Sequence, residues 1–449
     1  MNRTSALILA ERAVPRYTSY PTAPHFTSAV NHGLVTRWMA ALDPDASLSL
    51  YLHIPYCREM CAYCGCATKA TKRDEPVDAY VQTLIKEIRQ AGETTLAKSV
   101  RSIHWGGGTP SLVGAARFSR IMDVLGETFD LSRVEEHAVE LDPRVTDEAF
   151  IAAMAAHGAN RASLGVQDLN AHVQVAMGRV QPFDTVERCV GHLRAHGIDA
   201  INFDLMYGLP QQSVADVAAS ARLALTLAPS RIASFGYAHV PWMRAHQTMI
   251  DAASLPGAAE RIEQAEMAAR IFNEAGYVSI GLDHFALPED GLAIASAAGT
   301  MRRNFQGYVT DDADALIGFG ATSIGRLPPG YVQNFPDVGH WRRAVENGEL
   351  PIARGLVFSA DDHARGVVIE RLMCDFRVDF GAIAAHYFGH SDYFDDALTE
   401  LDALAAQNVL RRDQRVVEMT ESGRPFVRLA AAAFDAYLEH NKARHSVAI

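Results

Sequence analysis

Four of the six cysteines of this 449-residue chain crowd into its segment 51–66, which reads YLHIPYCREMCAYCGC. Cys57, Cys61 and Cys64 have the spacing CxxxCxxC, and Cys66 follows the motif closely. Thiols gathered in this way can form disulfides, bind zinc, or bind an iron–sulfur cluster. The crowding therefore predicts a site of cysteine chemistry.

These three kinds of site need different partners. A disulfide framework is disfavoured, because six cysteines are few for this length and the opening MNRTSALILAERAVP, with only a brief apolar patch, leads us to expect no secretory signal. A structural zinc ion usually takes a second, distant ligand pair, whereas Cys189 and Cys374 stand alone. Three thiolates suit a [4Fe–4S] cluster with one iron open for chemistry. We favour the cluster, and zinc with Cys66 as fourth ligand remains the alternative.

Strand and helix patterns alternate from Ser47 onward. Apolar residues at three- and four-residue steps predict helices between short apolar runs of β type. Such alternation calls for a parallel sheet with helices outside it, so we predict an α/β fold built as a partial (β/α)6 barrel, with chemistry at the carboxyl ends of its strands. The predicted strands are 48–54, 100–105, 136–141, 161–166, 200–207, 232–239 and 277–282, and the predicted helices are 76–90, 118–129, 146–157, 185–196, 214–227 and 261–275.

The patterns divide the chain into four segments. Residues 1–46, with the proline-rich stretch PRYTSYPTAPHF, are predicted to form an N-terminal arm, and residues 47–300 the barrel. Residues 301–358 are glycine-rich near their start and are predicted to be a loop-rich connection. Residues 359–449 are predicted to form a mostly helical, winged-helix-like cap, with helices at 367–374, 380–387, 393–406 and 425–439 and a hairpin of 409–412 with 415–419.

Composition disfavours several classes of function. The net charge of −12 argues against a nucleic-acid binder, and a winged-helix shape alone does not imply DNA binding. No apolar run approaches the roughly 20 residues that cross a bilayer, so we expect no membrane partner. The free thiols predict a reducing cytoplasm. Because the chain is acidic overall, an anionic substrate would need a local basic pocket.

Polar residues stand where several predicted strands end. Glu140 lies in an otherwise apolar strand, and Gln167 and Asp204 lie near the ends of two others. Such residues are either solvated, or caps of the following helix, or acceptors for a ligand. Arg179, in the stretch MGR, could form a surface ion pair. The glycines at 106–108 lack the GK[ST] of a phosphate loop, but they allow a ligand to approach the backbone closely.

The cysteine motif resembles that of the radical S-adenosylmethionine (SAM) enzymes, in which CxxxCxxC follows a strand and an aromatic residue, here Tyr63, precedes the third cysteine. The stretches PYC, CGC, RYTSYPTA, GGTP, GLDHFA and RNFQGY, spread over nearly the whole chain, are similar to those of one family, the oxygen-independent coproporphyrinogen III oxidases. The resemblance implies a [4Fe–4S] cluster on Cys57, Cys61 and Cys64 and a 5′-deoxyadenosyl radical made from SAM. The implied reaction converts two propionates of coproporphyrinogen III to vinyl groups, giving protoporphyrinogen IX.

The resemblance also implies two bound SAM molecules and roles for further residues. Cys66 is expected near the substrate rather than on the cluster, and Arg16 is expected to offer a cation to a substrate carboxylate. Lys69, Lys72 and Arg73 are further candidate cations by position. The first SAM is assigned to Tyr51, Gly107, Glu140 and Ile324, and the second to Tyr63, Gly108, Thr109, Gln167, Arg179, Asp204 and Ala238.

The sequence also suggests an electron donor, a location and two alternative functions. The basic group at 69–73 could equally attract an acidic electron donor such as flavodoxin, and we expect a cytoplasmic monomer. One alternative is that the protein is a haem-binding or haem-delivering relative that does not carry out the dehydrogenation, and Cys66 and the N-terminal arm argue against it. The other alternative is a zinc-stabilised protein without a redox role. Cys189 and Cys374 are expected to be buried thiols, and His104, His239 and His284 structural residues.

Overall fold

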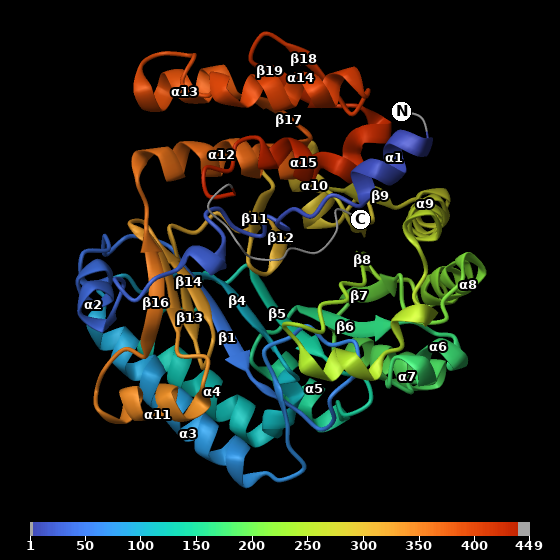
Figure 1. Ribbon diagram of the computed structural model, residues 1–449. Coiled ribbons are helices and arrows are strands. Elements are labelled where there is room, and N and C mark those ends of the chain that lie inside the picture. Colours follow the sequence, from blue (N-terminus) through green and yellow to red (C-terminus); the bar gives the residue numbers. More distant parts are fainter. Residues whose placement is uncertain (1–2, 439–449) are drawn as a thin grey trace.

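A long mixed β-sheet forms the centre of the structure, a computed structural model that describes residues 3–438. In this part of the chain its strand order is β16-β15-β14-β13-β1-β4-β5-β6-β7-β8-β10-β9 (Figure 1). The strands from β13 to β8 run parallel, and the outer strands pair antiparallel. The parallel strands are β1 (Leu48–Ile54), β4 (Val100–Gly107), β5 (Glu136–Leu141), β6 (Arg161–Gln167), β7 (Ala200–Tyr207), β8 (Arg231–Gly236) and β13 (Ala315–Phe319), and the outer ones are β9 (Val278–Ile280), β10 (His284–Ala286), β14 (Ile324–Leu327), β15 (Gly330–Asn334) and β16 (Ile352–Val357).

Helices cover the outer face of the parallel strands (Figure 1). On α3 the predicted apolar positions Val77, Tyr80, Leu84 and Ile88 are all buried in the main core. The predicted alternation of strands and outer helices is therefore confirmed. These helices are α3 (Glu75–Thr94), α4 (Gly114–Thr128), α5 (Glu148–Ala156), α6 (Ala171–Ala176), α7 (Phe183–Ala195), α8 (Val214–Leu225) and α9 (Ala258–Glu274), and α10 (Gly291–Ala297) and α11 (Val338–Glu346) follow.

The segment 301–358 differs from the predicted loop-rich connection. It contains the hairpin of β11 (Arg302–Asn304) and β12 (Gly307–Val309) and then β13 to β16, which extend the central sheet beyond β1. Glycines interrupt the apolar pattern by which these strands could be predicted from the sequence. A Cβ at Gly330 would collide with the Leu356 carbonyl, so the close approach of β15 and β16 requires glycine there. The domain boundaries themselves stay predictions.

The C-terminal segment forms a helical body with a small antiparallel sheet ordered β17-β19-β18, drawn above the main sheet in Figure 1. The predicted hairpin is confirmed as β18 and β19, whereas β17 is too short for a pattern to reveal. The predicted last helix is wrong in extent: α15 ends at Ala432, beyond which Asp435 accepts a hydrogen bond from the Tyr17 hydroxyl at 3.0 Å, and Glu439 lies outside the described residues. The elements are α12 (Ala360–Asp375), β17 (Arg377–Asp379), α13 (Phe380–Phe388), α14 (Leu398–Ala406), β18 (Leu410–Asp413), β19 (Val416–Met419) and α15 (Val427–Ala432).

The N-terminal arm joins the two bodies. After α1 (Arg3–Ala10) the chain is largely extended, and Tyr17 and Tyr20 are buried in the apolar core of the C-terminal body together with Phe380. The arm then crosses to the main sheet, where α2 (His32–Ala40) packs beside β16. Within residues 3–438 the structure shows no helix of the length and apolarity that a membrane span requires.

Candidate functional site

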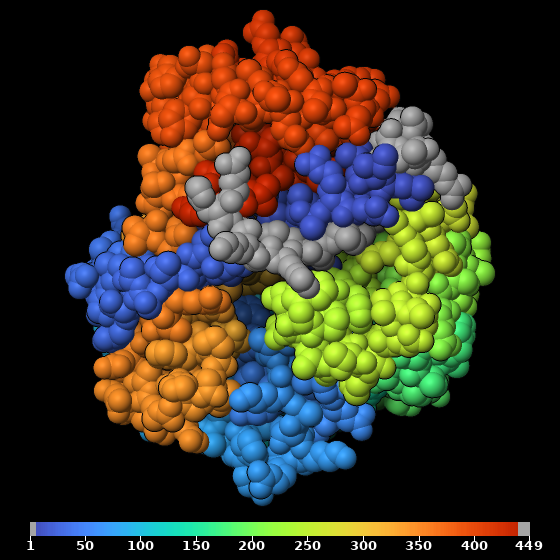
Figure 2. Space-filling view, viewed as in Figure 1, coloured from blue at the N-terminus to red at the C-terminus, as the bar shows by residue number. Residues whose placement is uncertain are grey.

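The predicted site residues lie at the carboxyl edge of the parallel strands. The cysteine loop follows β1, the glycine turn ends β4, Glu140 lies on β5, and Gln167 ends β6. Asp204 lies on β7, and Ile324 begins β14 directly after the loop that leaves β13. Parallel strands end at one edge, so segments distant in sequence meet there. Figure 2 shows a hollow between the cysteine loop, the β13–β16 strands and the segment 238–257.

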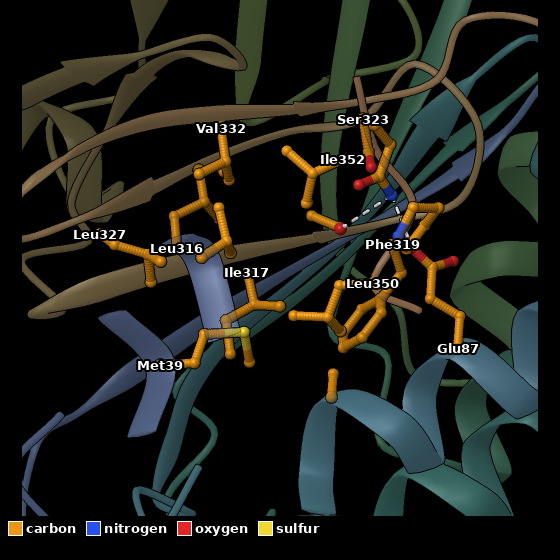
Figure 3. Close-up of a pocket in the computed structure, with 16 residues that line it drawn as sticks. Met39, Glu87, Leu316, Ile317, Phe319, Ser323, Leu327, Val332, Leu350 and Ile352 are labelled. Carbon is orange, nitrogen blue, oxygen red and sulfur yellow. Dashed lines mark hydrogen bonds between the residues drawn. The ribbon is translucent and has the colours of Figure 1, made fainter. Parts of the chain in front are cut away.

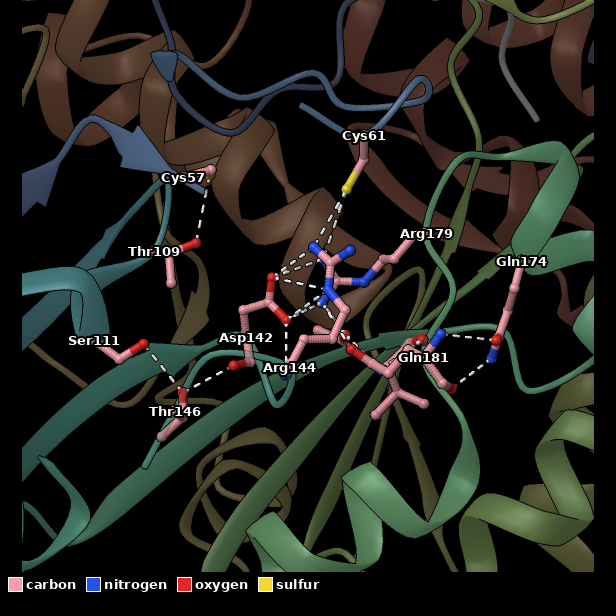
Figure 4. Close-up of polar contacts among 12 residues, drawn as sticks. Cys57, Cys61, Thr109, Ser111, Asp142, Arg144, Thr146, Gln174, Arg179 and Gln181 are labelled. Atoms are coloured by element: carbon pink, nitrogen blue, oxygen red, sulfur yellow. Dashed lines mark hydrogen bonds and ion pairs between the residues drawn. The ribbon is translucent and has the colours of Figure 1, made fainter. Parts of the chain in front are cut away.

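Hydrogen-bond donors surround the sulfur atoms of the motif (Figure 4). The hydroxyls of Thr109 and Thr68 lie 3.4 and 3.3 Å from the Sγ atom of Cys57. The amide of Cys66 donates to the Sγ atom of Cys64 at 3.3 Å. Donors of this kind stabilise thiolate charge and tune the potential of an iron–sulfur centre. These donors oppose the burial that raises the pKa of Cys57, and hydrogen bonds from Cys66 lower the pKa of Cys64 to about 6.

Two guanidinium groups approach the sulfur atom of Cys61. Arg144 and Arg179 lie 3.6 and 3.7 Å from the Sγ atom of Cys61, and both pair with Asp142, at 2.7 and 3.1 Å (Figure 4). Burial opposes ionisation of Asp142, but the two arginines hold its pKa below the usual value. The Arg179 side chain is only 7% exposed, so the surface ion pair considered for it is in fact a buried one. This group fastens the cysteine loop to the end of β5.

The thiols suit a multi-iron cluster better than a single ion. Among residues 3–438 no group of three or more His, Cys, Asp or Glu side chains is arranged to hold one metal ion. In a cuboidal cluster each thiolate binds a different iron, so its cysteines stand farther apart than the ligands of one zinc ion. Cys57 nevertheless lies within electrostatic range of Cys61 and Cys64. These residues therefore fit a [4Fe–4S] cluster.

The glycine turn after β4 comes very close to the cysteine loop. Gly107 has a φ of +112°, and a Cβ there would stand 2.7 Å from the imidazole of His53. A Cβ at Gly108 would stand 2.6 Å from the Tyr56 carbonyl. Glycine is therefore required at both positions, and the backbone stays accessible to a ligand. His53 is oriented by the hydroxyl of Tyr51, 3.0 Å from its Nδ1 atom.

Glu140 presents a carboxylate beside this turn. It accepts a hydrogen bond from the Gly107 amide at 3.2 Å and faces the Nε2 atom of His104 at 3.3 Å. Burial opposes ionisation, but His104 and the Gly107 amide hold the pKa of Glu140 below its usual value. Its side chain retains 43% exposure, so the carboxylate is open to a ligand. His104, expected to be structural, is thus a partner of a candidate site residue.

The two other polar residues at strand ends do not cap helices. Asp204 accepts hydrogen bonds from Asn202 at 2.9 Å and from Ser163 at 3.2 Å. Burial, and then the charge of Glu140, raises the pKa of Asp204 to about 6. Gln167 has a φ of +67°, at an irregularity in the pairing of β6 with β7. A non-glycine residue in this conformation costs about 1 kcal/mol or more, and such strain gathers at functional sites.

The remaining aromatic and backbone candidates line the same edge. The ring of Tyr51 stacks on that of His104 with 5.9 Å between centroids. Tyr63 lies in the cysteine loop, and its carbonyl accepts a hydrogen bond from Gln247 at 2.9 Å. The same amide group lies 3.3 Å from the Ala238 carbonyl. The structure brings these residues together, and their division between two SAM molecules stays a prediction.

The predicted cations occupy two separate places. Arg16 reaches from the arm to the end of β8, where it donates to the Gly236 carbonyl at 3.3 Å. Lys69, Lys72 and Arg73 are exposed in the segment that follows the cysteine motif, at the end of β1.

The cysteines outside the motif also differ in position. Cys66 is exposed, whereas Cys189 and Cys374 are buried, as predicted. Burial raises the pKa of each buried thiol to about 12, so both are unreactive near neutral pH.

Several residues of the site escape sequence reasoning. His53, Asp142 and Arg144 are described above, and His246 places its Nε2 atom 2.6 Å from the Cys64 carbonyl. One signal was available: Asp142 follows Glu140 by two residues, the period at which side chains of a strand share a face. His246 gave no signal, because its partner, the Cys64 carbonyl, lies far away in the sequence.

Comparisons with known proteins agree with this geometry. The family model of the Radical SAM superfamily matches residues 51–224. The oxygen-independent coproporphyrinogen III oxidase of Bradyrhizobium diazoefficiens is 44% identical over 100% of both chains, and that of Paracoccus denitrificans is 43% identical over 98% of each. The solved structure of the coproporphyrinogen III oxidase HemN from Escherichia coli, described as a radical SAM enzyme, has 33% identity and a TM-score of 0.89 over 95% of this chain and 100% of that one. The predicted α/β fold with its C-terminal helical part is confirmed.

Proposed function

The chain belongs to the oxygen-independent coproporphyrinogen III oxidase family of radical SAM enzymes, and we propose that it converts two propionate side chains of coproporphyrinogen III to vinyl groups, giving protoporphyrinogen IX, at the edge described above. The observation that carries this proposal is the 44% identity to a relative of that name over the full length of both chains. The haem-delivery alternative has no comparable support.

The cofactors are a [4Fe–4S] cluster and SAM. Cys57, Cys61 and Cys64 would hold the cluster, with Thr109 and Arg179 among the donors to their sulfur atoms. When bound, the reduced cluster and SAM would supply a 5′-deoxyadenosyl radical able to remove a β-hydrogen from a propionate. The substrate would then release carbon dioxide and pass one electron to an electron acceptor, which leaves the vinyl group.

The protein's own contribution is orientation. Glu140 is held by His104 and the Gly107 amide, and we propose that it accepts a hydrogen bond from an amino or hydroxyl group of SAM. We propose Tyr51, Gly107, Glu140 and Ile324 for the first SAM, and Tyr63, Gly108, Thr109, Gln167, Arg179, Asp204 and Ala238 for a second.

The surrounding segments would exclude water from the radical. The arm packs into the core of the C-terminal body, which Figure 1 draws above the main sheet. Exclusion of water prevents side reactions of a reactive intermediate. Arg16, at the end of β8, is proposed to contact a substrate carboxylate. The exposed thiol of Cys66, beside the motif, is proposed to face the substrate.

An acidic electron donor is the second proposed partner. Lys69, Lys72 and Arg73 are exposed beside the cysteine loop, and their charge can steer a protein such as flavodoxin towards the cluster. We further propose that the protein acts as a monomer in the cytoplasm.

The proposed function is tested by anaerobic incubation of the cluster-loaded protein with coproporphyrinogen III, SAM and dithionite. The expected result is a divinyl product that has lost two carboxyl groups, with methionine and 5′-deoxyadenosine formed. A Cys61→Ser protein under the same conditions should form none of these. A protein that binds haem tightly and yields no vinyl product would support the alternative, and a colourless protein with bound zinc would exclude the redox role.

A further inference from the structure

Cationic side chains from four separate segments converge near the ends of β7 and β8. Arg16 of the arm donates to the Gly236 carbonyl at 3.3 Å. Arg261 of α9 lies at the same place: a Cβ at Gly236 would stand 3.1 Å from its guanidinium and equally close to the hydroxyl of Tyr207. Arg16, Arg261 and Tyr207 therefore share one short stretch of the strand edge.

Two more arginines face this group from above. Arg303 of β11 donates from Nε to the Tyr17 carbonyl at 3.0 Å, and its guanidinium stands 4.3 Å from the centre of the Tyr308 ring. Arg428 of α15 is 6% exposed. Burial, and then the charge of Arg16, lowers the pKa of Arg428 to about 10, and Arg303 contributes in the same direction. We call Arg16, Arg261, Arg303 and Arg428 the arginine cluster.

One carboxylate is shared by three members of the arginine cluster: Asp283 lies within electrostatic range of Arg16, Arg303 and Arg428. Glu370 accepts a hydrogen bond from the backbone amide of Arg303 at 3.1 Å. Gathering like charges in a partly buried place costs Coulomb and desolvation energy, which a bound anion would offset. In the described structure the Nε atom of Arg261 and one terminal nitrogen of Arg303 are buried without a hydrogen-bond partner, so donors stand ready for an acceptor.

The arginine cluster also adjoins the proposed radical site. Asp204, on the neighbouring strand, lies within electrostatic range of both Glu140 and His284. The Nδ1 atom of His284 lies 2.7 Å from Asp283, the carboxylate beside the arginines. A molecule that extends from Glu140 towards the C-terminal body therefore passes from the proposed SAM site directly to the arginine cluster.

We infer that the arginine cluster binds the propionate carboxylates of the substrate that are not decarboxylated. This inference rests on the proposed function. The substrate carries four propionates and two react, so two carboxylates persist throughout and can anchor the macrocycle while a reacting side chain faces the radical. Guanidinium groups suit this task, because they bind carboxylates in bidentate geometry and stay charged. The convergence of the arm, barrel and C-terminal body then has a chemical reason: each contributes a cation.

The test uses coproporphyrin III, the aromatic and fluorescent form of the macrocycle, which keeps all four carboxylates and does not react. Its dissociation constant is measured on cluster-loaded protein by fluorescence titration for the wild type, Arg261→Gln and Arg303→Gln. Each substitution should weaken binding roughly ten- to hundredfold, the usual effect of losing a hydrogen bond to a charged group. Arg222→Gln, at an exposed position on α8, is the matched control and should bind like the wild type.

The tetramethyl ester of coproporphyrin III separates a charge contact from a structural effect. It has the same ring but no carboxylates, so it should bind weakly and equally to wild type and variants. An equal loss of affinity for ester and acid, or no loss for either, would overturn the inference. Arg303→Lys keeps the charge and should recover part of the lost affinity for the acid if the contact is ionic.

Both SAM and the porphyrin substrate carry carboxylates that the arginine cluster could bind. Measuring SAM affinity distinguishes between them. If Arg261→Gln and Arg303→Gln weaken SAM binding and leave coproporphyrin III binding intact, the arginine cluster serves the SAM carboxylate and the inference fails. The proposed function is judged separately, from vinyl product formed by the wild type. A wild type that forms product while the variants bind porphyrin normally would refute only the inference, and a wild type without product would refute the function.

Discussion

At the scale of single residues, the sulfur atoms of the motif have different partners. Cys57 has two threonine hydroxyls near its Sγ atom, and Cys61 has two guanidinium groups. Cys64 receives hydrogen bonds from both the backbone amide and the thiol of Cys66. Residue 66 as a whole is exposed. A role for this thiol in turnover is separated from cluster binding by substituting it.

Replacing Cys66 with serine should keep the cluster and impair turnover, because the amide that donates to Cys64 is unchanged. Cys61→Ser should lose the cluster, since one of three ligands is removed. Iron content and visible absorbance after anaerobic reconstitution measure the first effect, and vinyl product measures the second. Iron loss in Cys66→Ser as complete as in Cys61→Ser would show that the ligand assignment is wrong.

At the scale of elements, one buried carboxylate joins four segments beside a small cavity of about 30 Å³ (Figure 3). Glu87 of α3 accepts hydrogen bonds from the Gly320 amide at 2.8 Å, from Asn334 of β15 at 2.6 Å and from Trp341 of α11 at 3.0 Å. The loop that begins at Gly320 leads directly to Ile324 at the sheet edge. Glu87 thus helps to position a candidate SAM contact from outside the barrel.

Glu87→Gln should lower the free energy of unfolding by about 1–3 kcal/mol, because both oxygens of the Glu87 carboxyl group accept hydrogen bonds and the amide NH2 that replaces one of them cannot. Glu93→Gln, on the exposed face of the same helix, is the control and should change stability little. Chemical denaturation at fixed pH measures both. Equal stability of the two variants would contradict a structural role for Glu87.

The same carboxyl group should also make stability depend on pH. Burial raises the pKa of Glu87 to about 8, although its three donors oppose the shift. In the unfolded chain the group ionises near pH 4.5, so between these values the native state holds a proton that the unfolded state has lost. Stability from this group is complete below the lower value and falls as pH rises to the upper one. The stability difference between wild type and Glu87→Gln should therefore shrink from pH 5 to pH 8, and a constant difference would contradict the shift.

At the scale of the whole molecule, the acidic chain carries a local basic rim. Lys69, Lys72 and Arg73 are exposed beside the cysteine loop, while the net charge is −12. These cations would reduce the repulsion that an acidic protein meets when it approaches the cluster site. The arginine cluster lies elsewhere, under the arm and the C-terminal body. Substrate and electron donor would therefore use different faces.

Charge reversal of the rim should slow electron delivery by a protein donor. Lys72→Glu is expected to reduce flavodoxin-driven cluster reduction several-fold at low salt, and the effect should fade as ionic strength rises, because exposed charges are screened. Stopped-flow absorbance of the cluster follows the rate. Lys86→Glu, the same change on the exposed face of α3, is the control. A similar slowing with both variants, or with dithionite as the reductant, would argue against docking at the rim.

Much of the fold can be predicted from the local spacing of apolar residues in the sequence. The apolar spacing of Val77, Tyr80, Leu84 and Ile88 predicts α3, and the alternation of such segments with strands predicts the parallel sheet and the edge where its site lies. The strands β13 to β16 are missed, because glycines such as Gly330 interrupt their pattern where backbones approach closely. The end of α15 is missed, because contacts with the arm determine it.

The sequence alone determined the cysteine spacing, the family resemblance and the order of strands and helices, since these depend on neighbouring residues. Only the tertiary structure decided that Asp142 pairs with Arg179 beside Cys61, and that Arg16 and Arg428, from opposite ends of the chain, face the same carboxylate. The physical reason is distance along the chain: charge interactions act through space, and folding sets which charges meet.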